Sequence, residues 1–309
     1  MKKLLVICGP TAAGKTLLAL KLAKKFNGEP VSADSRQVYK MMDIGTGKEW
    51  GYGVKIWGYD LTDPKKEFSV AHYLKFANNI IEDIQRRGKL PILVGGTGLY
   101  IRGVIDGIPT VDVPRNKKLR ERLSEKTPED LYEMLSQIDA IRAGSLNSSD
   151  KRNPRRLVRA VEVAAWMIDN SKKRPRDSES HRDRSVLFLG LYASKDFLDK
   201  KIEERVDERV KKGVKMEIEK LLEIGVDWDD QSMMSLGYRQ WRGYFEGVID
   251  EDKVIEEWKK EEKRYARRQI TWFKKDKRIR WFDITEKKLI NNVEILVKKW
   301  YKEGDGKEN

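Results

Sequence analysis

The sequence predicts an α/β protein with a parallel sheet core, an all-helical insertion domain and a helical C-terminal region. Three observations support this fold class. In the first third of the chain, short apolar runs alternate with helical patterns, which is typical of a parallel sheet with helices on both faces. Residues 110–184 carry helical signals and no strand signal. After one further strand signal, the remainder of the chain has helical patterns only.

The strands are predicted from short runs rich in apolar and β-branched residues, bounded by glycine, proline or charged residues. The predicted strands are residues 3–8, 30–33, 54–61, 90–96 and 185–192. A helix over 17–26 follows the first strand, and the clearest helix is predicted over 70–87, where apolar residues recur on one stripe. Ser69 is a suitable N-cap for this second helix, and Gly88 is placed to end it.

Two domains are expected from this distribution of signals. Residues 1–109 together with 185–309 should form the core, and residues 110–184 should form the helical insertion. Within the insertion, TPED at 127–130 has a capping threonine, a proline at the first helical position and two acids in the first turn. The polar run at 169–184 is predicted to be a mobile loop.

Composition limits the classes of partner. The 309 residues include 64 Lys and Arg against 50 Asp and Glu, a formal net charge of +14. This surplus favours a nucleic acid or an anionic membrane as partner, and it also suits a highly charged soluble protein. The single cysteine, Cys8, excludes an intramolecular disulfide and a multi-cysteine zinc site. No apolar run has the length of a signal peptide or a membrane span, so we expect no membrane partner, no zinc and a cytoplasmic location.

A phosphate-binding motif follows the first predicted strand. GPTAAGKT fits G-x-x-x-x-G-K-[ST] between a strand and a helix, the context that a P-loop requires, so the core should be P-loop NTPase-like. Its glycines let backbone N–H groups turn toward phosphate oxygens at a positive helix end. Lys15 adds a charge, and the hydroxyl of Thr16 can bind Mg²⁺. The phosphate-binding candidates are Gly9, Pro10, Thr11, Ala12, Ala13, Gly14, Lys15 and Thr16.

Asp34 follows the second predicted strand, and three roles are open for it: magnesium ligand, general base or turn residue. The other predicted strands offer no acid that is better placed. In an open parallel sheet the carboxyl ends of the strands face one crevice, so the P-loop, Asp34 and the loop 95–98 should meet there. A P-loop small-molecule kinase with Asp34 as base is one interpretation. A non-catalytic, GTPase-like RNA-binding module is another, although the N-K-x-D signature is missing.

Five segments occur in the order found in one known family: GPTAAGKT, SADSRQVYKMMDIGTGK, ILVGGTGLY, NPRRLVRAVEV and RRQITWFKKD. Over nearly its whole length the chain thus resembles the tRNA dimethylallyltransferases, also called tRNA isopentenyltransferases. The resemblance implies transfer of a dimethylallyl group from dimethylallyl diphosphate to N6 of the adenosine on the 3′ side of the tRNA anticodon. It further implies that the P-loop holds the diphosphate of the donor together with Mg²⁺.

The resemblance also implies roles for three residues. Asp34 would act as general base on N6, and Thr11 and Arg205 would bind the diphosphate. The position of Arg205 can be judged from the sequence as well, because it lies beside the apolar stripe of segment 197–210, where a charge needs a partner. A buried ion pair with a neighbouring acid is the alternative role for this arginine.

Two predicted helices carry arginines on one face with no acid among them, at 152–159 and 264–275. An ordinary solvated face would mix acids with bases, whereas such stripes suit RNA phosphates and bases. The target base must leave its stack for N6 to be reached. The resemblance implies that residues 34–37 then contact it, and that the helical insertion also contacts the tRNA. The tRNA-binding candidates are Asp34, Ser35, Arg36, Gln37, Thr97, Arg120, Arg155, Arg156, Arg159, Gly237, Tyr238, Arg239, Arg267, Arg268 and Gln269.

Two departures from the family pattern concern the recognition loops. No His precedes DLTDP at 60–64, and GTGKE at 45–49 replaces the commoner GTAKP. Within the family the alternative is an adenylate dimethylallyltransferase, which prenylates a free nucleotide. The long insertion, the basic stripes and the positive charge argue against it. We expect the protein to be a monomer.

Overall fold

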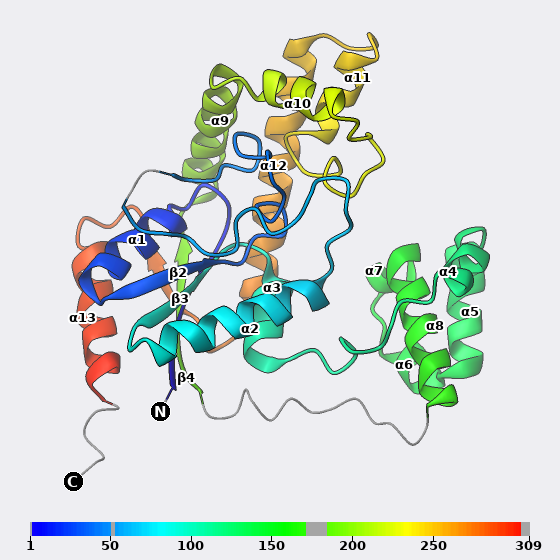
Figure 1. Cartoon of the computed structure of the whole chain (residues 1–309), viewed down its shortest axis with the longest axis horizontal. Coiled ribbons are helices and arrows are strands. Elements are labelled where there is room, and N and C mark those ends of the chain that lie inside the picture. The colour runs from blue at the N-terminus through cyan, green and yellow to red at the C-terminus, as the bar shows by residue number, and fades with distance from the viewer. Residues whose placement is uncertain (1, 51–52, 171–183, 304–309) are drawn as a thin grey trace. The chain divides into compact units, whose positions relative to one another are not determined.

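The structure is a computed structural model that describes residues 2–50, 53–170 and 184–303 (Figure 1). The chain divides into two compact units. Residues 1–106 and 180–309 form the first, which we call the sheet unit, and residues 107–179 form the second, the helical unit.

One sheet of five parallel strands runs through the sheet unit in the order β2-β3-β1-β4-β5, which confirms the α/β class. The strands are β1 Lys2–Cys8, β2 Gly28–Ser32, β3 Leu90–Val94, β4 Arg184–Tyr192 and β5 Arg280–Asp283. In the central strand, Leu5 pairs with Ile92 of β3 and with Leu187 of β4. Because all five strands are parallel, the P-loop after β1 and Asp34 after β2 leave the sheet at the same edge.

The prediction of a strand at 54–61 is wrong. An isolated bridge between Val31 and Trp57 is the link between this segment and β2. Gly58 and Asp60 have φ angles of 98° and 56°, in the left-handed region that a strand does not use. The apolar alternation of this segment therefore belongs to a loop that crosses the end of β2.

Strand β5 was not predicted from the sequence, which indicated helices throughout that region. Its 4 residues, RWFD, include two charged residues and no fully buried side chain. A strand this short at the edge of the sheet has no apolar run that could identify it.

Helices cover both faces of the sheet. Leu5 and Ile7 lie in one apolar core with helices α1 and α13, whereas Leu4 and Val6 point to the opposite face and are also fully buried. Ser69 caps α2 as predicted, since its hydroxyl accepts the N–H of His72 at 3.3 Å. The helices described in this unit are α1 Lys15–Lys25, α2 Val70–Arg86, α3 Gly98–Asp106, α9 Lys195–Lys211, α10 Val214–Glu223, α11 Arg242–Phe245, α12 Glu251–Phe273 and α13 Leu289–Lys302, with a 3-10 turn at Arg239–Trp241.

A second apolar core lies away from the sheet, among helices α9, α10 and α12. Val38, Tyr39 and Met42 are fully buried there together with Trp241 and Trp258. The first three of these residues follow Asp34 closely in the chain. The C-terminal helices therefore hold the segment that carries Asp34.

The helical unit contains α4 Lys117–Ser124, α5 Pro128–Ile138, α6 Ala140–Ser145, α7 Ser148–Lys151 and α8 Pro154–Asp169. Thr127 caps α5 and Pro128 is its first residue, as predicted. Apart from its ends, the predicted loop at 169–184 lies outside the described residues. In the described part of the whole chain, no helix is long and apolar enough to cross a bilayer.

Candidate functional site

The P-loop joins β1 to α1 with the backbone that its motif requires. Gly9 has a φ of 135°, and a Cβ there would lie 2.5 Å from the carbonyl oxygen of Leu191 in β4. Gly14, with a φ of 72°, is the N-cap of α1, and its helix end has no side-chain cap. The first N–H groups of α1 are therefore available to an anion.

Gln269 of α12 clamps the P-loop to the loop that follows β3. Its Oε1 accepts the backbone N–H of Thr11 at 2.8 Å, and its Nε2 donates to the carbonyl oxygen of Gly96 at 3.0 Å. The side chain is buried. The structure therefore gives this predicted tRNA-binding residue a role inside the protein, and both ends of its amide are in use.

A cavity opens over the P-loop and the carboxyl ends of β2 and β3. It brings together sequence-predicted residues from four separate parts of the chain. Ile56, Tyr59, Val94 and Tyr265 supply the apolar part of its wall. The predicted residues that line it are Thr11, Ala12, Gly14, Lys15, Thr16, Asp34, Gln37, Arg205 and Gln269.

Lys15 gives the cavity a positive charge that is only partly compensated. Its Nζ donates to the carbonyl oxygen of Pro10 at 2.5 Å. Burial, and then the nearby Arg205, lower the pKa of Lys15 from 10.5 to about 8, against the opposing effect of Asp34. An anion bound in the cavity would favour the charged form of this amine, so the site suits a phosphate group.

Arg205 reaches the same cavity without forming the alternative ion pair. Burial, and then repulsion from Arg209, lower its pKa from the usual arginine value to about 10. Among the described residues no carboxylate pairs with Arg205; instead Arg209 binds Glu262 at 2.9 Å. The buried ion pair thus exists one helical turn further along α9. The sequence does not reveal this pair, because 53 residues separate Arg209 from Glu262 in the chain.

Asp34 forms a local turn with one oxygen of its carboxylate and directs its side chain into the cavity. Its Oδ1 accepts the backbone N–H of Arg36 at 2.8 Å, which makes a local turn. In the part of the chain that the structure describes, Oδ2 has no hydrogen-bond partner, and the side chain lines the cavity with Lys15. The carboxylate is therefore oriented by its own turn and keeps one oxygen for a ligand.

The residues after Asp34 point in different directions. Gln37 is buried, and its Oε1 accepts the hydroxyl of Ser32 at 2.7 Å. The guanidinium of Arg36 donates to the carbonyl oxygen of Gln231 at 2.9 Å. Ser35 donates its N–H to the hydroxyl of Thr97 at 3.1 Å, so these two predicted residues lie side by side.

The predicted contact segment around Tyr238 belongs to the second core. Tyr238 is fully buried, and its hydroxyl donates to Glu217 at 2.6 Å. Gly237 has a φ of 86° and packs against the ring of Trp258. Arg239 is half-exposed and pairs with Glu261 at 3.1 Å. Of the three predicted residues, only Arg239 presents a charged group to solvent.

Two of the predicted arginines in the helical unit converge on one buried carboxylate. Glu162 of α8 accepts from Arg120 at 2.7 Å and from Arg159 at 2.5 Å. Arg159 also donates to the carbonyl oxygens of Thr110 and Val113. The sequence alone does not reveal that Arg120, which belongs to another helix, shares Glu162 with Arg159. Arg120 and Arg159 therefore stabilise the helical unit.

Acid should weaken the helical unit through Glu162. Burial alone would raise the pKa of this group, but the hydrogen bonds from Arg120 and Arg159 outweigh it and lower the pKa from 4.5 to about 2. The stabilisation is present above pH 4.5 and is lost as the pH falls through 2; the shift corresponds to about 3 kcal/mol. Urea unfolding between pH 6 and pH 2.5, followed by circular dichroism, should show a smaller pH dependence for Glu162→Gln. An identical pH dependence in both proteins would contradict this assignment.

The other predicted arginines are more exposed. Arg155 has no ion pair with any described residue, whereas Arg156 pairs with Asp150. In α12, Arg267 makes a long contact of 3.4 Å with Asp199, and Arg268 lies over the ring of Tyr265. Arg155, Arg267 and Arg268 are thus the candidates best placed for an external anion.

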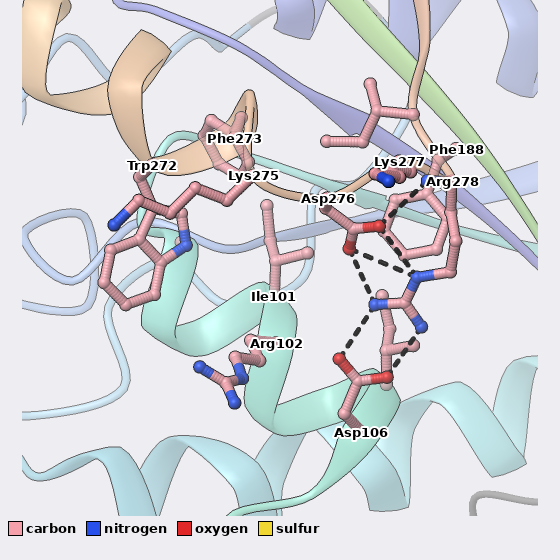
Figure 2. Close-up of a pocket in the computed structure, with 13 residues that line it drawn as sticks. Ile101, Arg102, Asp106, Phe188, Trp272, Phe273, Lys275, Asp276, Lys277 and Arg278 are labelled. Atoms are coloured by element: carbon pink, nitrogen blue, oxygen red, sulfur yellow. Dashed lines mark hydrogen bonds and ion pairs between the residues drawn. The ribbon is translucent and has the colours of Figure 1, made fainter. Parts of the chain in front are cut away.

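A second hollow, of about 400 Å³, lies between α3 and the turn after α12 (Figure 2). Arg278 donates to Asp106 at 2.7 Å and to Asp276 at 2.6 Å, so both acids share one positive charge. Trp272 is 41% exposed and packs against Gly98, the first residue of α3. Gly98 is two residues after Gly96 of the first cavity, so the edges of the two hollows lie within about 8 Å of each other.

The chain is similar over most of its length to proteins of one family. The model of the family described as IPP transferase matches residues 37–276. The tRNA dimethylallyltransferase of Carboxydothermus hydrogenoformans is 40% identical over 308 residues, which is 96% of this chain and 96% of that protein. The tRNA dimethylallyltransferase of Anoxybacillus flavithermus is 38% identical over 288 residues, covering 92% and 91% of the two chains.

Solved structures similar to this chain have descriptions of the same kind. The tRNA isopentenylpyrophosphate transferase of Bacillus halodurans superimposes with a TM-score of 0.73 at 33% identity, and the match covers 99% of each chain. A eukaryotic dimethylallyltransferase, described as acting on tRNA, superimposes with a TM-score of 0.82 at 26% identity. That match covers 98% of this chain and 80% of the other.

Proposed function

Because the chain belongs to the IPP transferase family, we propose that it transfers a dimethylallyl group from dimethylallyl diphosphate to N6 of the adenosine 3′-adjacent to the tRNA anticodon. One observation carries the proposal: P-loop residues, the unpaired Arg205 and the carboxylate of Asp34 line a single cavity. We also propose that the protein acts as a monomer in the cytoplasm.

The donor half of the reaction uses the positive side of the cavity. As the bond between the allylic carbon and the diphosphate oxygen breaks, negative charge builds on the leaving group. The free N–H groups of α1, Lys15 and Arg205 would stabilise that charge, and Thr11 lies beside them. The apolar wall with Ile56 and Tyr59 suits the five-carbon tail.

A magnesium ion fits the same cavity. The hydroxyl of Thr16 and the carboxylate of Glu49 both line it, and Mg²⁺ in phosphate sites commonly takes one or two protein oxygens with the phosphates completing its shell. Thr16 would hold the ion, which when bound adds positive charge beside the leaving diphosphate.

The acceptor half depends on Asp34. The lone pair of adenine N6 is delocalised into the ring, so the amine attacks poorly while it keeps both protons. As the new C–N bond forms, the free Oδ2 of Asp34 would take one N6 proton. Its other oxygen stays bound to the N–H of Arg36, which fixes the direction of the carboxylate.

The RNA would approach along exposed cations. Arg155, Arg267 and Arg268 suit backbone phosphates, and the hollow beside Trp272 offers an aromatic ring next to the cavity mouth. Arg120, Arg159 and Tyr238 would contribute through the folded structure instead, since their polar groups are already bonded inside it.

Replacing Arg155 with Ala should weaken tRNA binding about threefold to tenfold and lower the salt dependence of binding by somewhat less than one unit of slope. The guanidinium of Arg155 pairs with no described acid, so no internal ion pair is broken when it binds RNA. A loss of affinity in the variant therefore reports the phosphate contact alone. The measurement is filter binding of tRNA between 50 and 300 mM salt. Arg86→Ala, an exposed arginine of α2, is the matched control and should leave both quantities unchanged. An unaltered slope in Arg155→Ala would reject the RNA contact.

A labelled-donor assay tests the proposed function. The protein is incubated with Mg²⁺ and radiolabelled dimethylallyl diphosphate, with unmodified tRNA in one reaction and with AMP or ATP in another, and the label is located after nuclease digestion of the RNA. A third reaction contains γ-labelled ATP and a mixture of small-molecule acceptors in place of the prenyl donor. Label on N6 of the adenosine after the anticodon supports the proposal. Label in free AMP or ATP would instead indicate an adenylate dimethylallyltransferase. Phosphate transfer from ATP without prenylation would indicate a small-molecule kinase.

A further inference from the structure

One carboxylate outside the cavity collects an unusual set of donors. Glu217, in the first turn of α10, accepts the consecutive backbone N–H groups of Asp43, Ile44 and Gly45 at 2.8, 2.7 and 3.0 Å. Its Oε1 also accepts the hydroxyl of Tyr238 at 2.6 Å. Three successive amides directed at one anion form a backbone nest. In this molecule the anion is the protein's own side chain, 172 to 174 residues away in the chain.

The packing around this carboxylate leaves little freedom. A Cβ on Gly45 would lie 2.4 Å from the ring of Tyr238, so the loop backbone lies flat against that ring. Burial, and then the charge of Glu217, raise the pKa of Tyr238 well above its usual value, so its hydroxyl remains a donor. Nearby, Lys48 has no exposed side-chain surface and donates to Asp43 and to Asp60, each at 2.6 Å.

The loop that Glu217 holds is also part of the cavity wall. Thr46, Gly47 and Glu49 line the cavity. Gly47 lies directly against the guanidinium groups of both cavity arginines: a Cβ there would be 2.5 Å from Arg209 and 2.9 Å from Arg205. A shift of the loop would therefore change the space in front of Arg205. None of the loop's hydrogen bonds to Glu217 involves a cavity residue.

We propose that Glu217 is a positioning residue for the donor: by binding the amides of residues 43–45, it holds the loop 43–49 against Arg205 and Arg209 and so shapes the diphosphate end of the cavity. The inference rests on the proposed function for the identity of the donor. It assigns to α10 and Tyr238 a part in donor binding, although both lie outside the cavity.

The test uses two readouts on the full-length protein. Hydrogen–deuterium exchange of the peptide spanning residues 40–50 reports the hydrogen bonds between Glu217 and the amides of residues 43–45, and it needs no ligand. Calorimetry with dimethylallyl thiolodiphosphate, an unreactive donor analogue, and with inorganic diphosphate reports the cavity. Glu217→Gln replaces one accepting oxygen by an NH₂ group that faces donors. It should speed exchange of the three amides and weaken analogue binding, each about tenfold, while turnover at saturating donor changes less than about threefold.

Tyr238→Phe is the second variant, since it removes one donor of four and keeps the ring against Gly45. It should give changes in the same direction, about threefold. Glu162→Gln is the matched control: Glu162 also accepts four donors, from the backbone N–H of Asn116, from Arg120 twice and from Arg159, but it lies in the helical unit, which contributes no described residue to the cavity lining. It should lower stability and leave analogue affinity unchanged.

The outcomes separate the two proposals. If the wild-type protein binds neither the analogue nor diphosphate, the proposed donor is wrong, whatever the exchange data show. If the wild type binds the analogue and both Glu217→Gln and Tyr238→Phe bind it equally well, Glu217 has no positioning role and the inference is overturned. If Glu162→Gln weakens analogue binding as much as Glu217→Gln does, the effect reflects general destabilisation and the inference is likewise overturned.

Discussion

Asp34→Asn should lower the turnover number for prenyl transfer about a thousandfold, while tRNA and donor affinities change less than about threefold. The amide keeps the size of the carboxylate and can still accept the N–H of Arg36 with its oxygen. It cannot take a proton from N6. The expected defect is therefore confined to the chemical step, and single-turnover assays with saturating tRNA and donor will measure it directly.

Two controls sharpen this prediction. Asp34→Glu moves the free oxygen by the length of one methylene and should recover part of the rate, because a base is present again. Ser35→Ala removes a neighbouring hydroxyl near Thr97 and should cost far less. A parallel loss of turnover and of tRNA affinity in Asp34→Asn would assign the residue to the turn alone and reject its role as base.

Arg205→Met should lower kcat/KM for the donor about a hundredfold to a thousandfold and at the same time make the protein more stable. The guanidinium is partly buried beside Lys15 and Arg209, and no described acid forms an ion pair with it, so its charge is a cost in the free protein. Removing it should raise the free energy of unfolding by about 1 kcal/mol. Thermal unfolding tests the expected rise in stability, and donor kinetics on the same preparation test the expected fall in kcat/KM.

Arg209→Met is the matched comparison, one helical turn away. There the substitution leaves Glu262 buried without its partner, so the free energy of unfolding should fall by about 3 kcal/mol. Opposite stability changes for the two variants would confirm that Arg205 is held for a ligand and Arg209 for an internal ion pair. A loss of stability in Arg205→Met would indicate that Arg205 has a structural role and would contradict its assignment to the ligand.

The features that could be predicted from the sequence are those whose determinants are local. The P-loop between residues 9 and 16 brings its own glycines, lysine and threonine, and the position of Asp34 follows from the rule for strand ends. Helix α2 was predictable because Ser69 and an apolar stripe mark it within one segment.

The features that were missed depend on partners remote in the chain. An apolar alternation at 54–61 cannot reveal that Gly58 and Asp60 take positive φ angles over the end of β2. The same limit applies to the arginines: their periodicity suggested RNA-facing stripes, but Glu162 engages Arg159 together with Arg120 from another helix. Tyr238 and Gln269 are predicted to bind tRNA, but each bonds inside the protein to residues far away in the chain, Tyr238 to Glu217 and Gln269 to Thr11 and Gly96.

The clamp formed by Gln269 has a consequence for the order in which the enzyme can be assembled. Thr11 and Gln269, which form this clamp, are 258 positions apart in the chain. Asp43 and Glu217, which fix the loop 43–49, are 174 positions apart. Contacts over such separations form late and close large loops of chain. During synthesis from the N-terminus, the P-loop motif is complete after the sixteenth residue, yet the donor cavity cannot close until α12 has emerged. Nascent chains that carry the whole motif should therefore be unable to hold a diphosphate, which keeps the activity off until almost the last helix is made.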